Sequence, residues 1–139
     1  MKTRIIALAL AALLALSLAA CGDTPGPPPD LTGRWVQEGE ASSFYQVAEI
    51  TDDAIRVWWH LSEDDSEYLY WSGSFTPPQD ASRSYTWTSA NNFKEARRSA
   101  WARREDTMSF TYKDGKIGYV VYMGNLRMSM ALERAEGST

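Results

Sequence analysis

One histidine and one cysteine are the residues of this 139-residue chain best suited to act as a base or a thiol nucleophile near neutral pH. No serine or cysteine nucleophile accompanies His60 in a recognisable motif, so the pattern of a nucleophilic hydrolase is missing. We interpret His60 as a histidine at the end of a strand. Cys21 ends an apolar segment and belongs to no catalytic pattern. The sequence therefore predicts a protein that is not an enzyme.

A short acidic stretch raises the question of a metal site or a carboxylate pair. It contains Glu63, Asp64, Asp65 and Glu67. A calcium loop spaces its carboxylates at regular positions, and this spacing is missing here. A glycosidase holds two carboxyl groups across a cleft, which neighbours in one turn do not provide. We interpret the stretch as the solvated tip of a hairpin and expect neither a metal nor a cofactor.

A basic cluster is the most unusual charge feature. It consists of Lys94, Arg97, Arg98, Arg103 and Arg104. Without Lys2 and Arg4 the chain keeps 12 basic against 18 acidic side chains, a formal charge of −6, which argues against a nucleic-acid partner. The four arginines, with Trp58 and Tyr122 on outer strand faces, could bind an anionic polymer or an envelope protein. The alternative is a solvated loop partly neutralised by Glu95 and Glu105.

A methionine-rich and aromatic face is the second candidate site. Met108, Met123, Met128 and Met130 share it with Phe110, Tyr112 and Tyr119. Such side chains could line an adaptable pocket for an apolar ligand, or they could simply fill a core. The candidate pocket residues are Gln46, Trp59, Met108, Tyr119, Met128 and Met130.

Turn residues predict the strands that carry these side chains. Asp114-Gly115 is a two-residue hairpin signal, and Gly124-Asn125 is a second one. Counting outward from the first turn pairs Tyr112 with Ile117, Phe110 with Tyr119 and Met108 with Val121. Counting from the second pairs Met123 with Leu126, Val121 with Met128, Tyr119 with Met130 and Ile117 with Leu132. Both counts select the same apolar face of the middle strand, as expected of a real three-stranded meander.

The first half of the chain shows the same pattern. Asp52-Asp53 separates 43–51 from 54–61 and pairs Ile50 with Ile55, Ala48 with Val57, Gln46 with Trp59 and Glu49 with Arg56. Further strands are predicted at 33–37, at 67–75 and at 83–89. In the strand 67–75, one side is expected to carry Leu69, Trp71, Gly73 and Phe75. In the strand 83–89, one side is expected to carry Tyr85 and Trp87.

Residues 91–106 fit no single element. Asn92 and Glu95 could form a capping box, whereas 99–103 alternates around Trp101 and could be a strand. We expect a short irregular or helical insertion near 92–98. The predicted fold is all-β, an antiparallel meander of seven or eight strands closing into a small barrel, with a β-sandwich as the alternative. The predicted domain is 31–136.

The beginning of the chain predicts export. Lys2 and Arg4 precede an apolar run over 5–16, which has the length of a signal-peptide core and is too short to span a membrane. "LAAC", ending at Cys21, resembles the lipobox of bacterial lipoproteins, which implies cleavage after residue 20 and a diacylglyceryl anchor on Cys21. The proline-rich segment 21–30 then forms a semi-rigid tether. The expected location is the outer face of the cell membrane, or the outer membrane of a host that has two.

Two further resemblances concern fold and function. Gly33-x-Trp35 at the first strand is similar to the Gly-x-Trp start of the calycins (lipocalins and avidins), which implies a barrel with the tryptophan closing one end. "ITDDAIRVWW", "LYWSGSF", "YTWTSAN" and "SFTYKDGKIGY" resemble small lipoproteins of Gram-positive bacteria and their prophages, whose function is unassigned. We expect a tethered domain that recognises an envelope macromolecule, for instance in prophage-related exclusion or host interaction. The alternative is a calycin-like carrier of a small apolar ligand.

Overall fold

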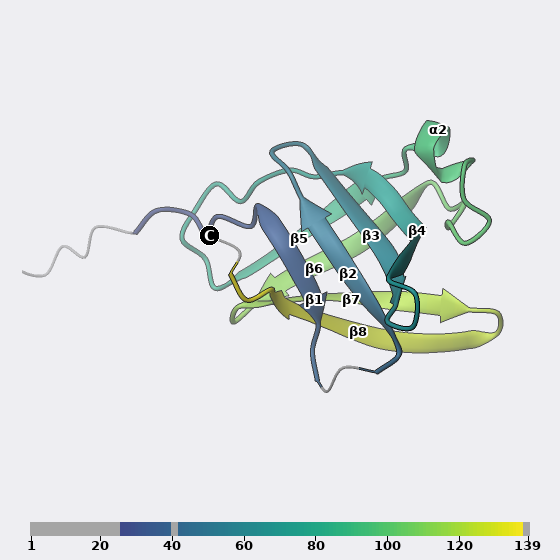
Figure 1. Cartoon of the computed structure of the whole chain (residues 1–139). Helices are drawn as coiled ribbons and strands as arrows, with labels where there is room; N and C mark the ends of the chain where they lie inside the picture. The colour runs from purple at the N-terminus through teal and green to yellow at the C-terminus, as the bar shows by residue number, and fades with distance from the viewer. Residues whose placement is uncertain (1–25, 40–41, 138–139) are drawn as a thin grey trace, which may run out of the picture.

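Eight antiparallel strands form one sheet in the computed structural model, which describes residues 26–39 and 42–137. They are β1 (Gly33–Gln37), β2 (Phe44–Ile50), β3 (Ala54–Leu61), β4 (Ser66–Ser74), β5 (Ser84–Ala90), β6 (Thr107–Lys113), β7 (Lys116–Met123) and β8 (Leu126–Arg134). Their order is β4-β3-β2-β1-β8-β7-β6-β5, so the first and last strands are neighbours. The sheet rolls into a nearly closed barrel (Figure 1). The all-β meander is confirmed, and the sandwich is wrong because all eight strands share one sheet.

The edges β4 and β5 meet at a seam that a few polar contacts hold together. Gly73 and Asn91 form an isolated bridge between them. The amide of Asn92 donates to the carbonyl of Ser72 at 2.8 Å, and the amide of Ala90 donates to the Ser74 hydroxyl at 2.8 Å. These bonds cover main-chain groups that an open barrel would leave unpaired.

Most of the predicted register is confirmed. In the β6–β7 turn both Asp114 (φ 49°) and Gly115 (φ 83°) have the left-handed conformation that a type I′ hairpin requires. The β7–β8 ladder contains every predicted pair, from Met123–Leu126 to Ile117–Leu132. The β2–β3 ladder likewise contains the four pairs counted from the Asp52-Asp53 turn.

The predicted alternation in β4 is wrong at its centre. The β3–β4 register shifts between Val57 and Trp58, so Leu69 lies opposite Trp58 while Trp71 lies opposite Val57. This β-bulge turns Leu69 to the outer side, where it is half-buried, and turns Tyr70 into the core beside Trp71. A strict period of two could not place both residues inside.

The predicted β6–β7 pairing extends too far. The ladder contains only Lys113–Lys116, Tyr112–Ile117 and Thr111–Gly118. Phe110 and Tyr119 touch through their rings, with centroids 5.1 Å apart, but neither they nor Met108 and Val121 belong to the ladder. The two strands diverge beyond Gly118, as Figure 1 shows.

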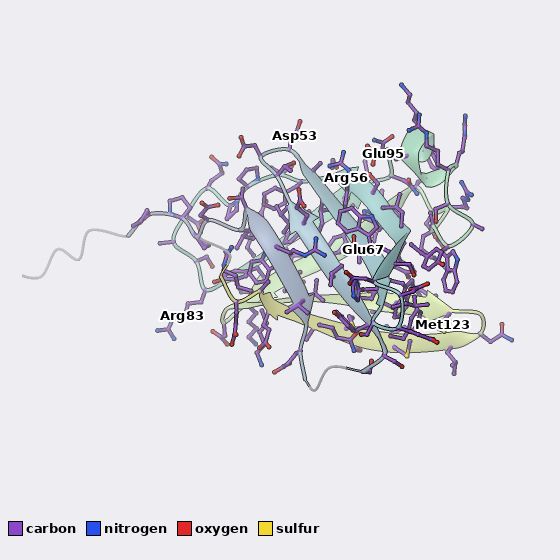
Figure 2. The ribbon with its side chains drawn as sticks, in the orientation of Figure 1. Asp53, Arg56, Glu67, Arg83, Glu95 and Met123 are labelled. Carbon is purple, nitrogen blue, oxygen red and sulfur yellow. The ribbon has the colours of Figure 1, made fainter. Side chains whose placement is uncertain are left out.

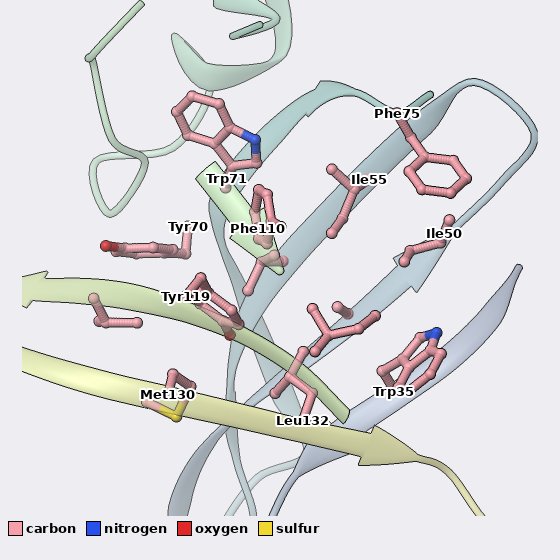
Figure 3. Close-up of a cluster of buried hydrophobic side chains, with 14 of the residues drawn as sticks. Trp35, Ile50, Ile55, Tyr70, Trp71, Phe75, Phe110, Tyr119, Met130 and Leu132 are labelled. Carbon is pink, nitrogen blue, oxygen red and sulfur yellow. The ribbon is translucent and has the colours of Figure 1, made fainter. Parts of the chain in front are cut away.

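The barrel interior is filled by one apolar cluster (Figure 3). Rings follow one another from Phe75 through Trp87 and Phe110 to Tyr119, with successive centroids 5.1, 5.3 and 5.1 Å apart. The fully buried Gln46 accepts a hydrogen bond from the Tyr119 hydroxyl in this interior. Burial raises the pKa of Tyr119 well above its usual value, so the hydroxyl stays a donor.

Trp35 closes the barrel near the start of the domain. Its side chain is 1% exposed, and its indole N–H donates to the carbonyl of Leu31 at 2.9 Å. The guanidinium of Arg134 lies 4.5 Å from the ring centroid and donates to the carbonyls of Asp30 and Thr32. One arginine thus joins the end of β8 to the segment that leads into β1.

The predicted signal segment 1–20 and Cys21 lie outside the described residues. Within residues 26–39 and 42–137, no helix has the length and hydropathy needed to cross a membrane. The chain enters the barrel through Gly26–Asp30 at the end where Trp35 lies. The β7–β8 turn and helix α2 (Phe93–Ala96) lie toward the opposite end (Figure 1).

Candidate recognition surface

Residues 91–106, which we call the insertion, join β5 to β6 across the seam. Asn92 caps α2, because its side chain accepts from the amide of Glu95 at 3.4 Å. The predicted helical turn near 92–98 is therefore confirmed, although the cap is not the reciprocal box: Glu95 turns toward the barrel instead. Residues 99–103 form turns and not a strand. The amide of Arg103 donates to the carbonyl of Tyr70 at 2.8 Å, and the hydroxyl of Ser99 donates to the carbonyl of Leu69 at 2.8 Å, so the insertion contacts the edge of β4.

Glu95 fastens the insertion to the outer face of the barrel (Figure 2). Its carboxylate accepts two hydrogen bonds from Arg56 of β3, at 2.8 and 2.9 Å, and one from the hydroxyl of Ser72 at 2.7 Å. These partners stabilise the charged form and lower the pKa of Glu95 to about 2. The bidentate geometry fixes the position of α2 over β3 and β4.

A groove of about 620 Å³ lies between this outer face and the insertion, and we call it the outer groove. Its apolar lining comes from Trp58, Tyr68, Leu69 and Trp101, and its charged lining from Arg56, Glu67, Glu95 and Arg98. Trp101 is 46% exposed although its ring lies 5.1 Å from that of Tyr68. Flat rings beside charged groups can stack on a sugar or peptide group and hold its polar atoms.

Trp101 also borders a second hollow, of about 340 Å³, at the barrel end near the β7–β8 turn, and we call it the end hollow. Its lining includes Tyr70, Arg103, Arg104, Tyr122 and Met123. The guanidinium of Arg103 lies 5.0 Å from the ring centroid of Tyr122. Trp101 is therefore shared between the two concave surfaces.

The structure divides the predicted partner-binding residues into two groups. Arg98 and Trp58 line the outer groove, while Arg103, Arg104 and Tyr122 line the end hollow. Tyr122 is 42% exposed, as expected for an outer-face aromatic. Trp58 also lies on an outer face, but it is half-buried rather than exposed, because the insertion lies over its face of the sheet.

The arginines of the insertion differ in the ion pairs and hydrogen bonds that they form within the protein. Arg103 forms an ion pair with Glu105 and is partly buried, so it has a structural role. Arg104 donates to the carbonyl of Ser99 at 3.2 Å and remains exposed. Arg97 and Arg98 are exposed, and no carboxylate of the described residues lies within ion-pair distance of either. Their charges are available to a partner.

The predicted pocket residues do not enclose a cavity. Gln46, Trp59, Tyr119 and Met130 are buried in the filled interior, and Met108 and Met128 pack against it. Met108, Tyr119 and Met130 also line a groove of about 560 Å³ that enters the barrel wall from outside, where β6 and β7 diverge. The predicted set is thus mostly core. Met123, placed on the same face, is exposed at the β7–β8 turn.

The acidic turn between β3 and β4 faces the histidine of β3. The carboxylates of Asp65 and Glu67 lie 3.1 and 3.5 Å from the two ring nitrogens of His60. His60 pairs with Tyr45 across β2–β3, as the register predicts. Among the described residues no group of three or more side chains has the arrangement of a metal site.

Trp101 is the residue of this surface that the sequence did not single out for binding. The position of Trp101 in the sequence fits a helix face and a strand centre equally well. Neither pattern indicates whether its side chain is exposed. The signal that could have found it is a large aromatic residue inside a charged, uncommitted segment. The chain matches no known protein family, no curated protein sequence and no solved structure.

Proposed function

We propose that the protein is a membrane-tethered lipoprotein without catalytic activity, whose β domain recognises an envelope macromolecule through the insertion. One observation carries the proposal: Arg98 and Arg104 are exposed and line concave surfaces together with the half-exposed ring of Trp101, and Arg97 is exposed next to Arg98 in the chain. Exposed aromatic and arginine side chains are the types most enriched at binding surfaces. An anionic wall polymer or the acidic face of an envelope protein fits this combination.

The position of the insertion supports this role. Gly26–Asp30 enters the barrel at one end, and the insertion lies toward the other end (Figure 1). A lipid anchor on Cys21 would hold the first end near the membrane. The insertion would then face outward, where wall polymers, envelope proteins or an incoming phage component are reached first. Exclusion of phage by a prophage-encoded lipoprotein is one form that such recognition takes.

The filled interior favours this function over the carrier. A calycin-like carrier needs a cavity of about 300 Å³ or more inside the barrel to hold its ligand. Here Trp59, Trp71, Trp87 and Phe110 occupy that space, each less than 5% exposed.

The experiment measures binding of the mature chain without its cysteine, residues 22–139, to delipidated envelope fragments. The double variant Arg97→Ser/Arg98→Ser should bind at least about tenfold more weakly, because it removes two exposed cations of the insertion that have no ion-pair partner in the described part of the chain. Wild-type binding should fall with salt, since the screening length drops from about 10 Å at 0.1 M to about 3 Å at 1 M.

The control removes the same charge elsewhere. Arg83 and Lys113 are exposed residues near the tether end, so Arg83→Ser/Lys113→Ser changes the net charge equally without touching the insertion. Equal losses in both double variants would indicate a nonspecific charge effect and contradict the proposal. Binding that is insensitive to salt and to the insertion arginines would also contradict it.

A further inference from the structure

The barrel wall is open between β6 and β7. Their ladder stops after three pairs at Thr111–Gly118, although β6 stays paired with β5 and β7 with β8 along their full lengths. Beyond Gly118, β6 is therefore paired only with β5, and β7 is paired only with β8. Figure 1 shows the two strands diverging there.

Tyr70 holds the strands apart. The bulge between β3 and β4 turns this side chain into the barrel, where it is 2% exposed. Its hydroxyl accepts a hydrogen bond from the amide of Tyr122 at 3.0 Å. In a continuous ladder, that amide would instead donate to a carbonyl of β6. The bulge thus places a side chain of β4, a strand that pairs with neither β6 nor β7, where its hydroxyl supplies the replacement bond.

The strand register identifies the residues whose main-chain groups face the opening. In antiparallel strands, alternate residues direct both main-chain groups to the same neighbour. The amide of Asp114 donates to Arg83 on the β5 side, so even-numbered β6 residues face β5 and Ser109 faces β7. The amide of Tyr122 points away from β8, so Val120 does too. Ser109 and Val120 therefore direct their amides and carbonyls into the opening, where no strand pairs with them.

The opening is a groove of about 560 Å³ whose lining carries no charge. Met108, Tyr119 and Met130 provide apolar surface, and the hydroxyls of Ser109, Thr111 and Ser129 provide polar surface. An extended peptide places successive side chains on opposite faces, so alternating apolar and hydroxyl residues match this lining. Main-chain donors and acceptors on the flanking strands match the backbone of such a peptide.

We propose that the β6–β7 opening binds an extended, uncharged segment of another polypeptide as an added strand. Pairing with an exposed strand edge is a general mode of peptide recognition. We take the occupant to be a segment of another polypeptide that carries no charge, because the lining of the opening carries none. Arg97 and Arg98, which the test of the proposed function removes, do not line this groove, so failure of either proposal leaves the other standing.

The test uses residues 22–139 and a capped peptide of alternating threonine and valine, seven residues long. In the free protein, the amides of Ser109 and Val120 should exchange with solvent at least about 100-fold faster than those of Phe110 and Val121, which point into complete ladders. The peptide should shift the NMR signals of Ser109 and Val120 saturably and slow their exchange. An analogue with alternate amides N-methylated should bind at least about tenfold more weakly.

Two proline variants locate the site. Ser109→Pro removes an amide that faces the opening and should weaken peptide binding at least about tenfold, while costing no ladder bond. Thr88→Pro is the matched control, because Thr88 directs its amide away from β6 toward the seam and should leave binding unchanged. If Ser109→Pro does not fold, Val120→Pro tests the facing strand in the same way.

Several results would overturn the proposal. One is slow exchange of Ser109 and Val120 in a free protein that is dimeric, which would mean that a second copy fills the opening. Another is binding of the apolar dye ANS at Met108 and Met130 without any peptide binding, which would assign the groove to small apolar ligands. Absence of peptide binding at millimolar concentration would overturn it as well.

Discussion

Glu95 shows how one side chain can couple a surface segment to the barrel. It belongs to a helix of four residues, which is too short to be stable by itself. Its bonds to Arg56 and Ser72 supply the tertiary contact that the helix lacks, and the same bonds depress its pKa. Stability at this contact is therefore linked to pH.

The sign of the pH effect follows from the lowered pKa of Glu95, about 2 in the folded protein against a usual 4.5. The contribution of Glu95 is complete above about pH 4.5 and is lost as the pH falls through 2. Glu95→Gln should cost about 1–2 kcal/mol at pH 7, with allowance for solvent screening at this partly exposed site. It should also flatten the decline in stability between pH 4.5 and 2.

Urea unfolding at several pH values measures both effects. Glu49→Gln is the control, since Glu49 is an exposed carboxylate opposite Arg56 in the β2–β3 ladder. Should both variants retain the wild-type pH profile, the bonds of Glu95 would not contribute to stability in solution.

Strand edges explain the unusual parts of the barrel. The seam between β4 and β5 lacks a full ladder, so the close approach of the two strands there depends on Gly73. A Cβ at this position would lie 2.3 Å from the Ser89 hydroxyl oxygen and 2.6 Å from the carbonyl oxygen of Ala90. The opening between β6 and β7 is the second interruption, and there the amide of Tyr122 donates to the Tyr70 hydroxyl of β4 instead of to β6.

Gly73→Ala should therefore destabilise the domain by about 1–3 kcal/mol, because the methyl group would push β4 away from β5. Gly118→Ala is the matched control: Gly118 also lies within a strand, but its nearest atoms would be 3.8 Å from a new Cβ. Differential scanning calorimetry should show a clear fall in Tm for the first variant and almost none for the second. Equal melting temperatures would mean that the seam opens easily and adds little to stability.

At the scale of the whole molecule, the barrel has two unlike ends. Trp35, Leu31 and Arg134 close the end where the chain enters, by packing and by hydrogen bonds to the entering segment. The other end has the insertion with Trp101 and the exposed β7–β8 turn. Such polarity suits a domain that is held at one end and binds at the other.

The anchor can be tested independently of the fold. Cys21→Ser should prevent lipidation and move the protein out of the membrane fraction, because two acyl chains are needed for stable attachment. Cell fractionation with labelled palmitate measures both lipid and location. Ser17→Ala, outside the lipobox, should change neither. Membrane association of Cys21→Ser at the wild-type level would contradict the lipobox interpretation.

The sequence by itself determined the features that depend on local rules. Two-residue turns such as Asp114-Gly115 set the register of their hairpins, since a slip of one residue would turn every apolar side chain outward. The all-β meander and the helical turn after Asn92 followed from the same short-range signals. The anchor on Cys21 also rests on a local motif, and it stays a prediction.

Only the tertiary structure decided the rest, because long-range packing overrides local alternation. The shift of Leu69 outward and Tyr70 inward comes from a bulge against β3, and beyond the end of the β6–β7 ladder the Tyr70 hydroxyl accepts from the amide of Tyr122. The exposure of Trp101 and the engagement of Arg103 depend on how the insertion crosses the seam. The Arg103–Glu105 ion pair joins residues two positions apart. The other contacts join residues too far apart in the chain for a sequence pattern to record them.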